Sequence, residues 1–309
     1  MSKPKYLMAL IYVCMLIGSH DLMGQDSTNR PQKLQKWVLG SVQVGFGLGS
    51  FYTLNKAWYA NYPKDKFHFY NDWKEWQQMD KAGHSWSAFQ LSRLSSNLWK
   101  AAGTPQKKAA WIGSLSSIGY MSIIEILDGY SEKWGFSNHD FLSNALGASI
   151  YLVQELSWKE EKISLKFSYF PVQYETLSPR ADELFGKSGI EKLLKDYNGQ
   201  TYWASLNIRS LFPESKAPGW LNLALGYGAK TMLGGYENKW TDNNGQFVSR
   251  PDILRYKRYY LSVDIDLNRI KTKNRTLKTI FSAANVLKIP APAIEFNSRG
   301  KVYFHPLFY

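Results

Sequence analysis

Residues 151–170 read YLVQELSWKEEKISLKFSYF, and the hydrophobic period changes within this stretch. Up to Glu160 the apolar residues recur at helical spacing, whereas from Ile163 to Tyr169 every second residue is apolar. A period of 3.6 is typical of a helix with one buried face, and a period of two is typical of a half-buried strand. The stretch predicts an α+β protein, in which a helical region over 35–160 is followed by a β-rich region over 161–309.

Four helices are predicted before the period changes. Their ranges are 37–59, 76–101, 107–128 and 137–158, and the first contains several glycines. Gly103-Thr104-Pro105 is a stop signal after the second helix, and Ser137 is placed to cap the start of the fourth. Short connections favour antiparallel neighbours, so we expect an N-terminal four-helix bundle. The charged segment over 61–73 is expected to be a loop.

Further strands are predicted along the β-rich region. Alternation recurs over 202–209, 221–228 and 261–268, a short strand is expected over 302–309, and helical patches interrupt near 190–197 and 277–287. Four or five strands are fewer than the roughly eight that a membrane barrel needs. We therefore expect a small antiparallel sheet. The final aromatic residue, Tyr309, resembles the terminal residue of outer-membrane sorting signals.

The first 24 residues predict export. Lys3 and Lys5 precede a short apolar run over 6–18, which is typical of a signal peptide cleaved near Gly24; an uncleaved anchor is the alternative. A polar linker over 25–34 follows. The single cysteine of the chain, Cys14, lies within the apolar run, so the mature protein is expected to have no disulfide. These features predict a periplasmic or outer-membrane protein of a Gram-negative bacterium.

Composition limits the classes of partner. The formal net charge is +13, but no nucleic-acid-binding module is visible, so nucleic acid is not expected. Aromatic residues make up 16% of the chain, which suits either a membrane interface or an aromatic-rich β core. Membrane or envelope components are the expected partners, and protein partners are not identified.

A group of polar residues in the helical region is the candidate site. Pairs spaced by three or four residues share a helix face, and a carboxylate within an apolar run is costly unless it is paired. Carboxylates beside His and Lys can serve acid–base chemistry, or they can form a structural network. No metal or cofactor is expected, because no HExxH, phosphate-loop or CxxC motif is present. The candidates are Asp80, Lys81, His84, Glu125, Asp128, Asp140 and Asn144.

Three ordered motifs resemble a known family. They are DKAGH at 80–84, EILDGYSEKWGFS at 125–137, and an Asp140-x3-Asn144-x2-Gly147 pattern. Together they resemble the YfiM-like predicted periplasmic lipoproteins, a family of unknown function, and more loosely the VanZ-like membrane proteins. The resemblance covers about residues 70–155, and DYNGQTYW at 196–203 is similar to longer members. This chain departs from the family because it lacks the lipid-bearing Cys after the signal peptide.

Two functions remain open from the sequence. In the first, the chain is a membrane-associated scaffold or binding module, and the seven polar residues form a structural network. In the second, it is a hydrolase or transferase acting on a lipid or cell-wall precursor. His84 would then be the general base, Glu125 or Asp128 would orient it or bind a cation, and Lys81 would hold an anionic group. The sequence does not decide whether the protein is an enzyme.

Overall fold

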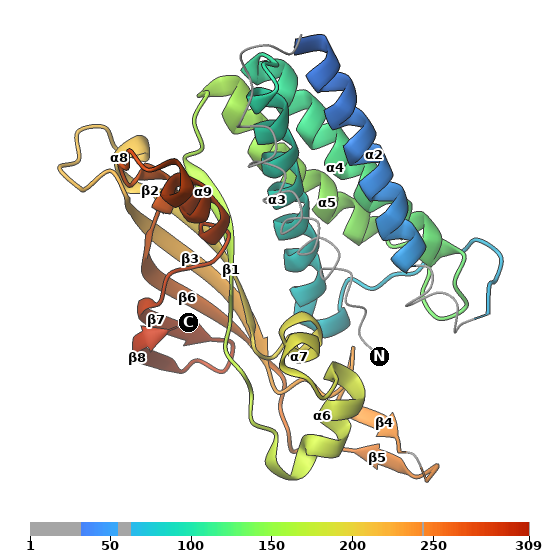
Figure 1. The fold of residues 1–309 in the computed structure, drawn as a ribbon. Helices are drawn as coiled ribbons and strands as arrows, with labels where there is room; N and C mark the ends of the chain where they lie inside the picture. Colours follow the sequence, from blue (N-terminus) through green and yellow to red (C-terminus); the bar gives the residue numbers. More distant parts are fainter. Residues whose placement is uncertain (1–31, 55–62, 243, 309) are drawn as a thin grey trace. The chain divides into compact units, whose positions relative to one another are not determined.

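The computed structural model describes residues 32–54, 63–242 and 244–308 (Figure 1). The predicted signal peptide, Cys14, most of the predicted linker and Tyr309 lie outside the described residues. The chain combines helices with an antiparallel sheet, as predicted. It divides into two compact units. The helical unit contains the described residues up to Asp72 together with His84–Glu161, and the sheet unit contains Trp73–Gly83 and Lys162–Tyr309.

Four long helices account for most of the helical region. They are α2 (Gln32–Leu54), α3 (Met79–Ala101), α4 (Gln106–Gly129) and α5 (Asn138–Ser157). The bounds of α3, α4 and α5 lie within a few residues of the predicted ranges, and α2 covers the predicted range up to Leu54, after which the prediction falls outside the described residues. The predicted cap is confirmed, because the side chain of Ser137 accepts a hydrogen bond from the backbone of Asp140 at 3.0 Å. The unit boundary falls inside α3, between Gly83 and His84.

Polar side chains fill much of the interior of the helical unit. One buried apolar cluster of the described residues contains six hydrophobic residues, among them Leu91 and Met121, and Trp86, Phe89 and Tyr151 are buried as well. A larger set of polar and charged residues is also buried. It includes His84, Ser87, Gln90, Ser92, Arg93, Ser95, Ser96, Ser114, Ser117, Glu125, Asp128, Asp140, Asn144, Gln154 and Glu155.

Large apolar side chains lie on the outside of the same helices. On α2 they include Trp37 and Leu48, and on α4 they include Leu115, which is 58% exposed. On α5, Leu142 and Leu146 are exposed as well. Among the described helices, α4 has the length and apolar composition that a membrane crossing requires. The helical unit therefore combines many buried polar residues with many exposed apolar ones.

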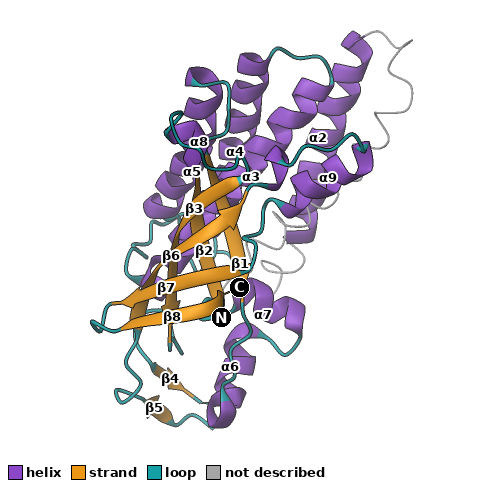
Figure 2. Ribbon diagram, turned by 90° about the vertical axis from the view of Figure 1, so that its left-hand side faces the viewer, coloured by secondary structure: helices purple, strands orange, loops and turns teal. Residues whose placement is uncertain are grey.

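The sheet unit is built on a six-stranded antiparallel sheet, drawn in orange in Figure 2. The strand order is β1-β2-β3-β6-β7-β8, and a separate pair is formed by β4 and β5. The strands are β1 (Ile163–Tyr169), β2 (Gln200–Asn207), β3 (Leu221–Lys230), β4 (Lys239–Thr241), β5 (Phe247–Ser249), β6 (Tyr256–Ile265), β7 (Ala291–Asn297) and β8 (Val302–Phe308).

Short helices connect the strands. The α-helices are α6 (Ser178–Phe185), α7 (Gly189–Lys195), α8 (Ile208–Leu211) and α9 (Arg275–Ala284). The 3-10 turns are η2 (Glu75–Gln78), η3 (Glu175–Leu177) and η4 (Leu267–Arg269). The predicted helical patches correspond to α7 and α9, whereas α6 and α8 were not predicted.

Two predicted strands end earlier than expected, and three strands were not predicted, namely β7 of the main sheet and the pair β4 and β5. Asn207 ends β2 because its side chain caps α8 by accepting from the backbone of Ser210 at 2.9 Å. Asp266 caps η4 in the same way, so residues after Ile265 leave the sheet. In the main sheet the strand that was not predicted is β7, which contains Pro292 in an alternating segment. The sheet therefore has six strands instead of the four or five expected.

The two faces of the sheet differ in polarity, and the polar face is the buried one. On β3 and β6, Asn222 and Asp264 are buried, whereas Leu225 and Leu261 on the alternate positions are exposed. The buried face curls around an aromatic cluster. Trp203 on β2 and Phe308 on β8 lie 5.9 Å apart between ring centroids, although three strands separate them.

Candidate functional site

His84 is the centre of the candidate site in the helical unit. Its side chain is fully buried, and its ring is approached from both nitrogens. Nδ1 lies 2.9 Å from Oδ1 of Asn144 and 3.8 Å from Oε1 of Glu125. Nε2 lies 3.5 Å from Oδ1 of Asp140. The structure thus brings together residues of α3, α4 and α5 that are up to 60 positions apart in the sequence.

Asp140 and Asn144 are positioned by the start of α5. Asp140 lies in the first turn, where the exposed N–H groups favour a negative charge. Ser137 fixes this turn, because its oxygen accepts from the backbone of Asp140 while its hydroxyl donates to Oδ1 of Asp72 at 2.6 Å. Asn144 follows one turn later on the same face, so both side chains reach His84.

Close contact between helices keeps the cluster buried. A Cβ atom at Gly147 would collide with the backbone oxygen of Ser85 on α3, and a Cβ at Gly113 on α4 would collide with the backbone of Ser92. The hydroxyl of Ser85 also donates to the carbonyl of Ser143 at 2.9 Å. Small residues at these crossings allow the backbones to approach, as in helix packing within membranes.

The remaining three candidates are Asp128, in the helical unit, and Asp80 and Lys81, in the sheet unit. Asp128 is buried one turn beyond Glu125, where α4 ends, and its carbonyl accepts from the backbone of Ser131 and Gly135. Asp80 and Lys81 lie in the first turn of α3 and belong to the sheet unit. There Lys81 contacts Oδ2 of Asp80 at 3.2 Å.

Sequence reasoning missed the partner of Asp80. The hydroxyl of Tyr197 donates to Oδ1 of Asp80 at 2.9 Å, and both residues belong to the sheet unit. The ring of Tyr197 also contacts that of Trp76, with centroids 5.5 Å apart. The motif DYNGQTYW contains this tyrosine, but no spacing in the sequence relates it to a residue 117 positions earlier.

The geometry allows proton transfer but gives no open path to the ring. Because the amide oxygen of Asn144 accepts, Nδ1 of His84 donates, and Nε2 is the nitrogen that can gain or lose a proton. Asp140 would stabilise a positive ring. However, His84 and Glu125 both have no exposed surface, so a substrate would reach them only if the helices moved apart.

The cluster also contains ligand types that bind metals. His84 and Asp140 supply a nitrogen and an oxygen, and Asp80, one turn earlier on α3, is a third ligand type but belongs to the sheet unit. Zinc sites use at least three protein ligands. The described part of the helical unit does not by itself complete such a set on the Nε2 side of His84.

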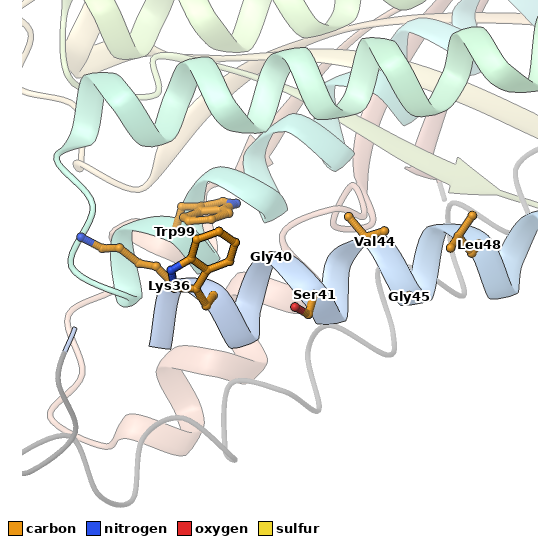
Figure 3. Close-up of a pocket in the computed structure, with 8 residues that line it drawn as sticks. Lys36, Gly40, Ser41, Val44, Gly45, Leu48 and Trp99 are labelled. Carbon is orange, nitrogen blue, oxygen red and sulfur yellow. The ribbon is translucent and has the colours of Figure 1, made fainter. Parts of the chain in front are cut away.

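An apolar groove runs along α2 (Figure 3). Its volume is about 780 Å³, and its lining includes Trp37, Gly40, Val44 and Leu48 of α2 with Trp99 of α3. Lys36 stands at one end and donates to the carbonyl of Gly103 at 3.2 Å. The groove offers apolar surface to a ligand, but it contains none of the seven candidate residues.

Comparison with known proteins identifies one family. Residues 67–155 match the model of a family described as predicted periplasmic lipoprotein, DUF2279. All seven candidate residues lie within the matched segment. No curated protein and no solved structure matches the chain. The match supports an exported, periplasmic location, and it leaves the role of the protein in the envelope uncharacterised.

Proposed function

We propose that this chain is a membrane-associated scaffold or binding module of the cell envelope. In this proposal α2, α3, α4 and α5 form a four-helix bundle whose outer surface faces lipid. The residues around His84 tie three of these helices together. The predicted domain organisation, with a bundle over 35–160 and a β-rich region over 161–309, is part of the proposal.

The observation that carries the proposal is that the helical unit buries charged and polar residues while it exposes large apolar ones. Leu48, Leu115 and Leu146 are each more than half exposed, on three different helices. Glu125 and Asp128, the two acidic residues of α4, have no exposed surface. In water this arrangement would expose a large apolar area and bury costly polar groups. In a membrane the same arrangement is favourable, because lipid covers the apolar side chains and polar groups such as His84 and Asn144 pair inside.

The complete burial of the His84 cluster supports a structural role for it. Removal of one member would leave a buried partner without its contact, at a cost of about 1–3 kcal/mol. Such networks fix how helices pack, and polar contacts between helices serve this purpose within membranes. A scaffold or binding module needs a fixed arrangement of helices and does not need an open catalytic site.

Alkaline carbonate washing of cell membranes tests the association. The protein is expected to stay in the membrane pellet. Leu115→Lys combined with Leu146→Lys should weaken retention of the protein in the pellet, whereas Glu132→Lys, at an exposed position, should not. Quantitative release of the unaltered protein into the wash would contradict the proposal. N-terminal sequencing of the mature protein separately tests export, with Gln25 as the expected first residue.

The contact of both His84 nitrogens with acidic or amide groups favours a second candidate. In this alternative the chain is a hydrolase or transferase that acts on a lipid or cell-wall precursor. Asp80 and Lys81 would contribute from the first turn of α3. The alternative requires the helices to separate enough for a substrate to reach the ring.

His84→Gln and Glu125→Gln separate the two candidates, with Glu132→Gln as the exposed control. Each protein is produced in a strain that lacks the gene, and growth under detergent stress is compared with the melting temperature. A scaffold predicts that growth is lost in step with melting and returns at low growth temperature. An enzyme predicts lost growth at every temperature while melting changes little. The second result would replace our proposal with the alternative.

A further inference from the structure

The outer face of the sheet is apolar, and over β3, β6, β7 and β8 it is also exposed. Neighbouring strands align their apolar residues in rows: Leu225 pairs with Leu261, and Leu261 pairs with Ile294. Leu223 pairs with Val263 in the next row. Leu225 is 50% exposed, and its row neighbours are at least one-third exposed. Several adjacent side chains of this kind form a patch of the sort that marks an interaction surface.

The opposite face of the sheet is buried and contains a polar network. There Lys166 donates to Asp264 at 2.8 Å, and Ser205 donates to the same carboxylate oxygen at 2.6 Å. Asn222 donates to Ser205 at 2.8 Å and extends the network to the next strand. These residues are all buried, so the polar side of the sheet is already filled. The apolar rows therefore point away from this buried polar network.

Each end of the apolar face has residues that suit a membrane surface. At one end, Tyr227 pairs with Tyr259, and Tyr259 pairs with Phe296, so an aromatic row crosses three strands. Aromatic rows of this kind lie at headgroup level in membrane proteins. At the other end, β6 ends and η4 leads into α9, which lies near that end of the sheet in Figure 1.

The helix α9 is amphipathic and basic. Leu277 and Ile280 are exposed, 41% and 53% respectively, on a helix that also contains the exposed Lys278. Lys271 and Lys273 precede it and are exposed as well. Exposed apolar residues beside lysines are typical of helices that lie in the interface of an anionic membrane. A second copy of this chain would bring the same positive charge, whereas anionic lipid brings the opposite charge.

We infer that the outer face of the sheet, together with α9, rests on an anionic lipid bilayer. The rows of Leu, Val and Ile contact the acyl layer, and the lysines of α9 contact anionic headgroups. The sheet lies on the membrane and does not cross it, because β1 and β8 are edge strands, and the bridge from Phe167 to Leu287 pairs only part of β1. The remaining edge backbone groups could not be satisfied in hydrocarbon. This inference rests on residues of the sheet unit, and so it goes beyond the proposal for the helical unit.

Fluorescent labelling of single cysteines tests this contact. Cys14→Ser removes the native thiol, and Leu225→Cys then carries an environment-sensitive dye in the full-length protein. The matched control is Ser249→Cys, at an exposed position of β5 in the same unit. Both proteins are reconstituted in vesicles of phosphatidylethanolamine and phosphatidylglycerol. Nitroxide-labelled lipid and aqueous iodide serve as the two quenchers.

The dye at position 225 is expected to emit at shorter wavelength, to lose fluorescence to the lipid quencher and to resist iodide. The dye at position 249 should show the opposite pattern. Replacing phosphatidylglycerol by phosphatidylcholine should reduce lipid quenching at 225, and unchanged quenching would exclude the role given to α9. Equal iodide quenching at both positions would overturn the inference. Dye-to-dye transfer at 225 without lipid quenching would show a second copy there and would also overturn it.

Two further variants keep the outcomes separate. Val263→Cys, in the neighbouring row, repeats the measurement if Leu225→Cys does not fold. Leu115→Cys reports on α4 in the helical unit. Lipid quenching at 115 with iodide quenching at 225 would reject this inference and keep the proposed function. The reverse pattern would reject the proposed function and keep this inference.

Discussion

The helical unit and the sheet unit both bury polar residues and expose apolar ones, but they satisfy the buried groups differently. In the sheet, Asp264 accepts hydrogen bonds of 3.1 Å or shorter from Ser205 and from the backbone of Ile289, and it pairs with Lys166 at 2.8 Å. In the helices, the carboxylates of Glu125 and Asp140 lie 3.5–3.8 Å from the ring of His84.

The difference follows from the directions in which strands and helices present their side chains. A strand alternates its side chains, so one polar face can form a continuous network across neighbouring strands. A helix presents one polar residue per turn to each neighbour, so the contacts gather at crossing points where small residues allow close approach. We therefore expect the sheet network to depend on its ion pair and the helical network to depend on its glycines.

Asp264→Asn should have the largest effect on stability. It leaves the buried ammonium of Lys166 without its charged partner, and we expect a loss of about 3–5 kcal/mol in the free energy of unfolding. Urea denaturation followed by tryptophan fluorescence measures the change. Asp252→Asn, in an exposed pair with Arg250, is the control and should cost less than about 1 kcal/mol. Equal losses for the two variants would show that the sheet network is not what holds this unit together.

Gly147→Ala should have the next largest effect. The added Cβ collides with the backbone of Ser85 and forces α5 away from α3, at a cost of about 3 kcal/mol. Gly119→Ala on α4 is the matched control, because a Cβ there meets nothing within 4 Å. That change should be neutral or stabilising by up to about 1 kcal/mol. Thermal unfolding in detergent compares them, and similar melting of both proteins would argue against tight packing of α5 on α3.

Asn144→Ala should cost about 1–3 kcal/mol, because it removes the acceptor of the Nδ1 hydrogen bond of buried His84. Asn138→Ala, an exposed change on the same helix, should stay within about 0.5 kcal/mol of the unaltered protein. The same thermal assay serves for both. Equal melting temperatures for the two alanine variants would show that the cluster does not contribute to the packing of the helices.

The smallest expected effect is a pH dependence from Lys288. Burial lowers the pKa of this lysine from 10.5 to about 8, in part opposed by Asp264. Its ammonium lies 4.7 Å from the ring centroid of Trp203. Because the unfolded chain binds more protons between pH 8 and pH 10.5, the stability contribution of this group rises with pH across that window. Lys288→Met should flatten the rise in urea titrations at pH 8 and pH 10. An unchanged slope would assign the effect to other groups.

The sequence correctly predicted most helices and strands, but it did not predict which face of each strand is buried. The period change near Glu160 located the junction of helix and sheet, and Ser137 was identified as the cap of α5. The alternation of Leu221 to Gly228 predicted β3 but did not say which face is buried. That choice depends on partners such as Lys166 and Asp264, which lie 98 positions apart and have no local signal.

The candidate site was predicted only in part, because spacing in the sequence relates residues within one helix and not residues on different helices. Helical spacing grouped Asp80 with His84 and Asp140 with Asn144, and the apolar surroundings of Glu125 suggested a buried carboxylate. The contacts between these groups depend on Gly113 and Gly147, whose role at helix crossings is visible only in three dimensions. The contact between Asp80 and Tyr197 joins distant segments and could not be predicted from spacing.

The central claim is that the outer surface of the helical unit lies in lipid, and a series of labels along α4 tests it most directly. Single cysteines replace Trp111, Leu115, Ile123 and Ile126, which are all exposed on this helix, in a Cys14→Ser background. Spin labels at these positions in reconstituted vesicles report accessibility to oxygen, which concentrates in lipid, and to a water-soluble nickel complex. We expect high oxygen and low nickel accessibility, with the strongest protection at Leu115 and Ile123. High nickel accessibility at all four positions would show that the surface faces water and would contradict the account.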